Sequence, residues 1–242
     1  MKQIAIITPV PESITSLIQN SMLRRAVDKS IVEFHVVSLR DYSEGNYRQV
    51  DDEPFGGGSG MVMMPEPLFK ALDYSIQKMG DDSGIRVIYP TPLGEQWTHE
   101  TALENAEVEK LIYICGHYKG VDERVIKKYV THEYSIGDFV VTSGELPALL
   151  MIDSIVRLIP GVLNTYESAM TDSFAADLLD GPHYTRPREI EGMSVPDVLL
   201  EGHHKKIEEW RMKHRIERTK IHRPIMWKEY LKKEKTSEKE NE

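Results

Sequence analysis

Short runs of branched apolar and tyrosine residues alternate with helical patterns through the first two-thirds of the chain. Four runs are nearly continuous in such residues, which is typical of strands covered on both faces of a sheet. These runs lie at 4–8, 33–37, 86–89 and 111–115, and weaker candidates follow at 133–136 and 138–142. Helical patterns fall at about 12–28, 66–79, 98–106, 122–130 and 145–158. The alternation predicts an α/β fold with a mostly parallel sheet.

The pattern changes after residue 161. Residues 162–188 contain helix breakers, Gly181-Pro182 and Arg186-Pro187, and show no strong period, so we expect an interdomain linker there. Helical spacing resumes at about residue 194, and the last residues are charged and of low complexity. We therefore predict a first domain at 1–161, a linker at 162–188, a helical domain at 189–232 and a disordered tail at 233–242.

The charge of the chain is unevenly distributed. Its 242 residues carry a formal net charge of −9, which by itself argues against a dedicated nucleic-acid-binding protein. The segment from His203 to Arg223, however, holds eight lysines and arginines against three glutamates, a net charge of +5, so the remainder sums to −14. A basic helix that includes Trp210 suits contact with phosphates, although a solvated amphipathic helix has the same pattern.

Other totals narrow the class of protein. The single cysteine, Cys115, excludes a disulfide framework and fits a reducing, cytoplasmic location. Since no apolar run approaches the roughly 18 residues of a membrane span, we expect no membrane segment. Nine histidines occur without a metal-binding spacing, and we predict no metal ligands from them.

Three glycine-punctuated segments are candidates for ligand loops. Residues 56–60 include four glycines but match neither a P-loop nor a dinucleotide fingerprint, so a plain flexible loop remains an alternative. Residues 115–124 follow a strand and open a helix, where α/β sheets bind ligands, or where Asp122 simply caps the helix. Residues 135–147 read either as a ligand loop or as a strand, turn and helix.

Taken in order, these segments resemble a known family. The matching segments are 50–61 (VDDEPFGGGSGM), 115–124 (CGHYKGVDER), 135–140 (SIGDFV), 144–148 (GELPA), 159–161 (IPG), 172–174 (DSF), 182–187 (PHYTRP) and 202–211 (GHHKKIEEWR). The chain is similar to the bacterial tRNA (guanine-N1)-methyltransferases of the TrmD type, in the SPOUT superfamily. The resemblance implies methylation of N1 of the guanine immediately 3′ of the anticodon, position 37 of tRNA.

The resemblance also implies an architecture. The first domain should end in a deep trefoil knot, which general topology rules alone would reject. A small helical domain should follow, and the protein should be an obligate homodimer with active sites at the subunit interface. S-adenosylmethionine is the implied methyl donor and tRNA the implied partner.

Carried over position by position, the resemblance assigns residues to roles. Asp172 would be the general base and Arg157 an electrostatic partner. The cofactor would contact Tyr89, Pro90, Thr91, Gly116, Tyr118, Gly120, Ser135, Ile136, Gly137, Phe139, Val141, Ser143, Gly144 and Pro147. The tRNA would contact Gly56, Gly57, Gly58, Lys119, Ser168, Lys205, Lys206, Arg211 and Arg215.

The chain departs from the family's pattern at two positions. The family usually has glutamate where this chain has Lys119, and that glutamate is implicated in a requirement for Mg²⁺, so the resemblance leaves magnesium dependence open here. Ser143 replaces a glycine, which costs stability only if the position needs a positive φ. Two other functions stay open: a knotted methyltransferase with another RNA target, and a non-catalytic tRNA-binding protein.

Overall fold

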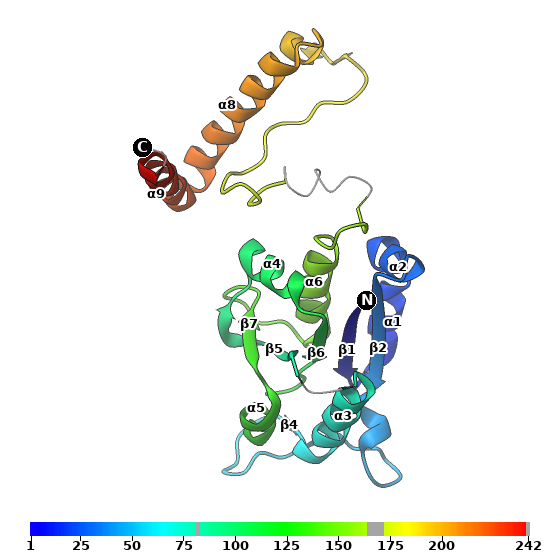
Figure 1. Cartoon of the computed structure of the whole chain (residues 1–242). Coiled ribbons are helices and arrows are strands. Elements are labelled where there is room, and N and C mark those ends of the chain that lie inside the picture. Colours follow the sequence, from blue (N-terminus) through cyan, green and yellow to red (C-terminus); the bar gives the residue numbers. More distant parts are fainter. Residues whose placement is uncertain (81–82, 164–171, 241–242) are drawn as a thin grey trace. The chain divides into compact units, whose positions relative to one another are not determined.

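The protein is described by a computed structural model covering residues 1–80, 83–163 and 172–240. Contacts divide the chain into two compact units, Met1–Asn164 and Thr165–Glu242, which are described here one at a time (Figure 1). The division falls within the segment 162–188, for which the sequence predicts a linker.

The first unit is built on a five-stranded parallel sheet, as the sequence predicts. Its strand order is β2-β1-β6-β5-β7, and the pairs between neighbours all run parallel. The strands are β1 (Lys2–Thr8), β2 (Val32–Ser38), β5 (Ile85–Gln96), β6 (Lys110–Ile114) and β7 (His132–Ser135). A short antiparallel pair, β3 (Asp51–Asp52) with β4 (Val62–Met63), lies outside this sheet.

Helices cover both faces of the sheet, so the unit has three layers (Figure 1). One face carries α1 (Pro11–Ile18), α2 (Ser21–Asp28) and α6 (Glu145–Val156), with α4 (His99–Glu107) packed on α6. The other face carries α3 (Pro65–Lys78), α5 (Glu123–Tyr129) and the 3-10 turn η1 (Leu39–Tyr42).

Alternation along β1 shows how the sequence produces these layers. Successive side chains of a strand point to opposite faces. Ile4 and Ile6 belong to the core cluster under α1, α2 and α6, whereas Ala5 and Ile7 belong to the cluster under α3 and α5. All four side chains are buried. The strand is therefore covered on both faces, as its unbroken apolar run predicts.

Two local predictions in this unit were wrong. The predicted helix 12–28 is two helices, because Asn20 is extended (φ −126°) and Ser21 has a φ of 52°. Residues 138–142, a weaker strand candidate, form a loop, because β7 lies at the edge of the sheet and Gly137, with a φ of 138°, turns the chain away from it.

Among residues 172–240, the second unit includes the helices α8 (His204–His222) and α9 (Pro224–Glu240). A short hairpin, β8 (Glu189–Ile190) with β9 (Met193–Ser194), and the 3-10 turn η2 (Asp197–Leu199) precede them. Where the sequence predicts a disordered tail from 233 on, α9 instead continues to Glu240. Lysine and glutamate favour helix, and Lys233 Nζ pairs with Asp177 at 2.9 Å. In the part of the chain that the structure describes, no helix is long and apolar enough to cross a membrane.

A buried lysine fastens the start of β1 to the end of α4. Lys2 is 7% exposed, and its Nζ donates to the carbonyl oxygens of Asn105 (3.0 Å), Ala106 (3.1 Å) and Val108. These are carbonyls at the end of a helix, which have no partner within it.

We predict that Lys2→Met lowers the free energy of unfolding by about 1–3 kcal/mol, because it leaves buried carbonyl groups without a donor. Urea titration would measure the change. Lys127→Met is the matched control, since the Lys127 side chain is 74% exposed and its ion pair among the residues that the structure describes is with Glu123 on the surface. Equal stability of the two variants would contradict a structural role for Lys2.

Candidate functional site

A cavity of about 200 Å³ opens in the first unit where β5, β6 and β7 give way to loops. Ligands of open α/β sheets bind at this carboxyl edge. All of the residues predicted to contact the cofactor line the cavity: Tyr89, Pro90, Thr91, Gly116, Tyr118, Gly120, Ser135, Ile136, Gly137, Phe139, Val141, Ser143, Gly144 and Pro147. Three segments far apart in the sequence therefore meet in one place.

The first wall of the cavity comes from within β5. The pairing of β5 with β7 shifts register between Pro90 and Glu95, so the residues between them leave the regular sheet. Tyr89, Pro90, Thr91 and Pro92 line the cavity at this irregularity. A bulge of this kind re-aims side chains next to functional sites.

The second wall is the loop 115–122 between β6 and α5. Backbone hydrogen bonds join it to the residues that follow the glycine-rich loop 56–60: Lys119 N donates to Met61 O (2.9 Å), and Met63 N donates to Gly120 O (2.9 Å). Asp122 N in turn donates to Met63 O at 3.1 Å. Asp122 also caps α5, because its carboxylate accepts from Arg124 N, so the predicted cap is confirmed, and the same loop lines the cavity.

The glycine-rich loop has the conformation that only glycine adopts readily. Gly56, Gly57, Gly58 and Gly60 have φ values of 86°, 77°, 119° and 94°. The aliphatic part of Lys119 lies along Gly60, where an added Cβ would be 3.0 Å from Lys119 Cγ. Lys119 itself is exposed and lines the cavity, with no ion pair among the described residues.

The third wall, residues 135–147, comes very close to the second. Gly144 N donates to Gly116 O at 2.7 Å, and a Cβ on Gly144 would lie 2.5 Å from Gly116 N and 2.8 Å from Cys115 Cα. No larger residue fits at position 144 without moving the backbone. Ser143, by contrast, is not among the described residues with positive φ, so the serine that replaces the family's glycine causes no backbone strain.

A buried carboxylate connects these walls to the sheet. Glu145, at the start of α6, is 3% exposed. Its oxygens accept from Thr8 Oγ1 (2.5 Å), at the end of β1, and lie 2.8 and 2.9 Å from His117 Nε2, in the second wall. Because an ionised carboxylate only accepts hydrogen bonds, Nε2 of His117 is the protonated nitrogen here.

Hydrogen bonding outweighs burial at Glu145. Burial raises the pKa of this carboxyl group. Hydrogen bonds from His117, Ser143 and Thr8 together lower the pKa by more than burial raises it, so the net pKa lies below the usual 4.5. The group is therefore ionised at neutral pH, and the folded state holds the charge with three donors. Removing any donor loosens the contact between two walls of the cavity.

Sequence reasoning missed this cluster. Thr8, His117 and Glu145 are not adjacent in the chain, and nothing in their spacing brings them together. A weak signal was available, since an acidic residue follows Gly144 at the start of a helix whose next seven residues are apolar. Pro92, Tyr134, Val140 and Thr142 also line the cavity without having been predicted.

The two predicted catalytic residues lie in different units. Arg157 follows the last turn of α6 in the first unit, where it is half-buried. Asp172 is half-buried in the second unit, and its carbonyl oxygen accepts from Ala175 N at 3.3 Å. Ser168, predicted to contact tRNA, lies outside the described residues.

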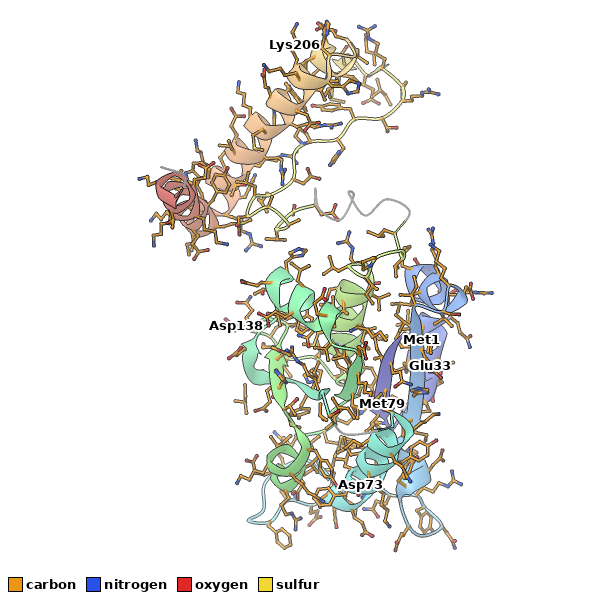
Figure 2. The ribbon with its side chains drawn as sticks, viewed as in Figure 1. Met1, Glu33, Asp73, Met79, Asp138 and Lys206 are labelled. Atoms are coloured by element: carbon orange, nitrogen blue, oxygen red, sulfur yellow. The ribbon has the colours of Figure 1, made fainter. Side chains whose placement is uncertain are left out.

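The basic residues predicted on α8 are not equally available. Lys205 is exposed, and Lys206, in the first turn of α8 (Figure 2), pairs with Glu201 at 3.6 Å. Arg211 pairs with Glu208 at 2.7 Å. Arg215 is half-buried and its Nε donates to Leu179 O (3.4 Å), so it contributes to packing of the second unit.

Metal binding finds no support in side-chain clusters. Across residues 1–80, 83–163 and 172–240, no group of three or more histidine, cysteine, aspartate or glutamate side chains is placed to hold a metal ion. Cys115 is fully buried, and burial raises the pKa of its thiol, so it behaves as a small apolar residue of the core.

Comparison with known proteins gives matches over almost the whole chain. The sequence model of the family described as tRNA (Guanine-1)-methyltransferase TrmD matches residues 1–229. The tRNA (guanine-N(1)-)-methyltransferase of Shouchella clausii is 50% identical over 228 residues, 94% of this chain and 92% of the relative. The proteins of the same name from Clostridioides difficile and Bacillus subtilis are 49% and 46% identical, over 92% and 94% of this chain and 96% and 93% of their own lengths.

We predict that Glu145→Gln lowers the free energy of unfolding at neutral pH by about 1–3 kcal/mol, because an amide cannot accept from all three donors. Since the pKa of Glu145 is lower in the folded than in the unfolded chain, its stabilisation is present above about pH 4.5 and is lost as the pH falls further. Urea titrations at several pH values would measure both effects.

The control for that experiment is Glu123→Gln, because the Glu123 side chain is 70% exposed and its ion pair in the described part of the chain is with Lys127. Wild type and Glu123→Gln should lose stability in parallel below pH 4.5, and Glu145→Gln should lose less. Parallel loss in all three proteins would show that Glu145 does not carry this stabilisation.

Proposed function

Because the chain belongs to the tRNA (guanine-1)-methyltransferase TrmD family, we propose that it methylates N1 of the guanine that follows the anticodon, position 37 of tRNA, with S-adenosylmethionine as the donor. The observation that carries the proposal is the single cavity that gathers every predicted cofactor-contacting residue from three separate segments. The predicted alternatives, another RNA target or binding without catalysis, have no structural observation in their favour.

The cavity suits the adenosine part of the proposed donor. Pro90, Ile136, Val141 and Pro147 provide apolar surface for a base, and the glycines leave backbone N–H and C=O groups open to approach. Gly116, Ile136, Gly137 and Val141 are the residues whose backbone we expect to hold the adenine and ribose. When bound, S-adenosylmethionine supplies a methyl group on a positively charged sulfur.

Asp172 is the proposed general base. Guanine N1 carries a proton at neutral pH and is a poor nucleophile until that proton leaves, so a carboxylate within hydrogen-bond reach accelerates transfer. Arg157 would stabilise the negative charge that builds on guanine O6 as the proton leaves. The target base should be turned out of its stack, since its N1 edge is otherwise occluded.

Exposed apolar side chains support a homodimer. Leu146 and Leu150 lie one turn apart on α6 and are 61% and 51% exposed, and Leu93 and Val140, beside the cavity, are 90% and 85% exposed. Large apolar side chains this exposed are typical of protein interfaces when they gather in one area, and a second copy of the chain is the partner that the family resemblance implies. An active site shared between subunits would let Asp172 of one chain serve the cavity of the other.

The trefoil knot also belongs to the proposal. The close approach of Gly144 to Cys115 and Gly116 supports it, because the chain after β7 passes directly against the loop after β6. The bond from Cys115 N to Ile7 O (2.9 Å) fixes that loop to β1. A threaded chain needs such tight backbone contacts, and Gly144 makes one possible.

The glycine-rich loop and Lys119 would form the side of the site that faces the guanine. The loop is exposed at Gly56 to Gly58, and the Lys119 side chain runs along Gly60 toward it. A lysine at this position places a fixed positive charge where the family's glutamate would place a negative one. We propose that Lys119 contacts RNA phosphate and makes the reaction independent of Mg²⁺.

We predict that Asp172→Asn slows methyl transfer about 100-fold or more, because the amide cannot accept the N1 proton. The assay follows labelled methyl groups from S-adenosylmethionine to tRNAs with and without guanine after the anticodon. Cofactor affinity, measured by calorimetry, should stay at the wild-type value.

Asp177→Asn is the matched control, since Asp177 lies in the same unit and pairs with Lys233. If Asp172→Asn transfers methyl groups as fast as Asp177→Asn, the proposed base is wrong. If the wild type methylates both kinds of tRNA, the proposed target is wrong, and if it binds tRNA without transfer, the protein is a binding module.

We predict that the wild-type rate is the same with added magnesium as with EDTA, and that Lys119→Glu becomes dependent on magnesium because it restores the family's carboxylate. Rates on one preparation of folded tRNA would measure this. Lys127→Glu makes the same charge change on exposed surface and should behave as wild type. A wild type that needs magnesium would refute the role given to Lys119.

A further inference from the structure

The second unit contains a cavity of about 410 Å³ to which the family resemblance assigned no role. It lies between residues 184–188 and the segment 195–200 that includes η2. The lining residues are Tyr184, Thr185, Arg186, Arg188, Val195, Leu199 and Leu200. We call it the 184–200 pocket. A bond from Val195 N to Arg188 O (2.9 Å) joins the two sides at the base of the β8–β9 hairpin.

The charge of the pocket is positive. Arg188 Nη2 lies 3.3 Å from Asp197 Oδ1, which neutralises this arginine and holds its side chain. Arg186 is exposed and has no ion pair among the described residues. No carboxylate lines the pocket. One guanidinium is therefore available to an anionic ligand, in a planar form that binds phosphate through two parallel hydrogen bonds.

Tyr184 contributes an aromatic ring to the same pocket as Arg186. Tyr184 is 50% exposed, and its ring lies 6.3 Å from the ring of Trp210 on α8, which in turn lies 4.0 Å from the ring of His214. Trp210 and His214 therefore support Tyr184 from within the unit, and part of the tyrosine ring remains open. Leu199 and Leu200 add apolar surface, and Leu200 is 45% exposed.

An aromatic ring, an apolar floor and an unpaired guanidinium match the parts of one nucleotide. Bases stack on aromatic side chains with little sequence preference, and the adjacent phosphate needs a cation. A base in a helix is stacked and paired already, so the ligand must be an unpaired nucleotide. The size of the pocket falls within the range of roughly 300–1,000 Å³ that holds small ligands.

We propose that the 184–200 pocket binds one unpaired nucleotide of the tRNA substrate, with the base against Tyr184 and the phosphate on Arg186. The inference rests on the proposed function for its RNA. It adds a contact of a different kind from those of α8, because Tyr184 offers a ring for stacking beside the exposed guanidinium of Arg186, whereas exposed lysines of α8 such as Lys205 offer charge alone.

Binding of full-length protein to tRNA, with two substitutions in the pocket, tests the proposal. Tyr184→Ala should weaken binding about tenfold or more through lost stacking, without changing the dependence on salt. Tyr184→Phe keeps the ring and should bind as wild type. Arg186→Ala should weaken binding and reduce the slope of log K against log salt by about one, because one phosphate contact is lost.

Lys127→Ala is the matched control for charge, because Lys127 is exposed on α5, outside the basic segment 203–223, and its ion pair in the described part of the chain is with Glu123 at 3.6 Å. The KM for tRNA should rise in both pocket variants while kcat and affinity for S-adenosylmethionine stay unchanged. With a fully paired RNA duplex as the probe, Tyr184→Ala should bind as wild type, since no unpaired base is present.

The outcomes separate this inference from the proposed function. If Arg186→Ala binds tRNA like Lys127→Ala, and Tyr184→Ala binds it like Tyr184→Phe, the pocket does not hold a nucleotide, even when the wild type methylates tRNA. Weaker binding of the duplex by Tyr184→Ala would also overturn it, by showing general damage to the unit. If the wild type transfers no methyl group but Tyr184→Ala and Arg186→Ala still bind tRNA more weakly than the wild type, the proposed function is refuted and the nucleotide pocket is not.

Discussion

The cavity of the first unit depends on one buried carboxylate. Glu145 accepts from the end of β1 through Thr8 and from the loop after β6 through His117, and Ser143 adds a third donor from the loop after β7. A charge this deeply buried is tolerated only with good partners. Two of those partners, His117 and Ser143, lie in the second and third walls of the cavity, and Thr8 ties them to the end of β1. A fold that did not bring these donors to Glu145 would leave a buried charge unpaired, so the cost of burial favours the fold in which the second and third walls meet.

Most of the first unit could be predicted from sequence because its information is local. Continuous apolar runs at 4–8 and 111–115 predict strands covered on both faces, and in the structure the residues of both runs are buried. Segment 138–142 misled the same reasoning, since Phe139, Val140 and Val141 have the composition of a strand but no neighbouring strand pairs with them. Pairing is a long-range property, and composition alone does not contain it.

The candidate site shows the same limit. Sequence motifs located the second and third walls, the family resemblance supplied Tyr89, Pro90 and Thr91 of the first, and every residue predicted for the cofactor lines one cavity. The Thr8–His117–Glu145 contacts were not predictable, because they join residues more than 25 positions apart. Counting charges on α8 likewise predicted a basic surface, whereas Arg211 is paired and Arg215 is packed inward. Net charge says how many cations a segment has, and only the structure says which of them face outward.

The backbone bonds between Met61, Met63 and the loop 119–122 have a consequence for the order of events during turnover. The glycine-rich loop and the loop at Gly116 to Gly120 are fastened to each other, so a ligand that restricts one also restricts the other. If the proposed cofactor and tRNA bind at these two loops, the first to bind would remove part of the chain's freedom near the second. The loss of conformational entropy would then be shared between two binding events, which is a source of cooperativity that requires no change of shape.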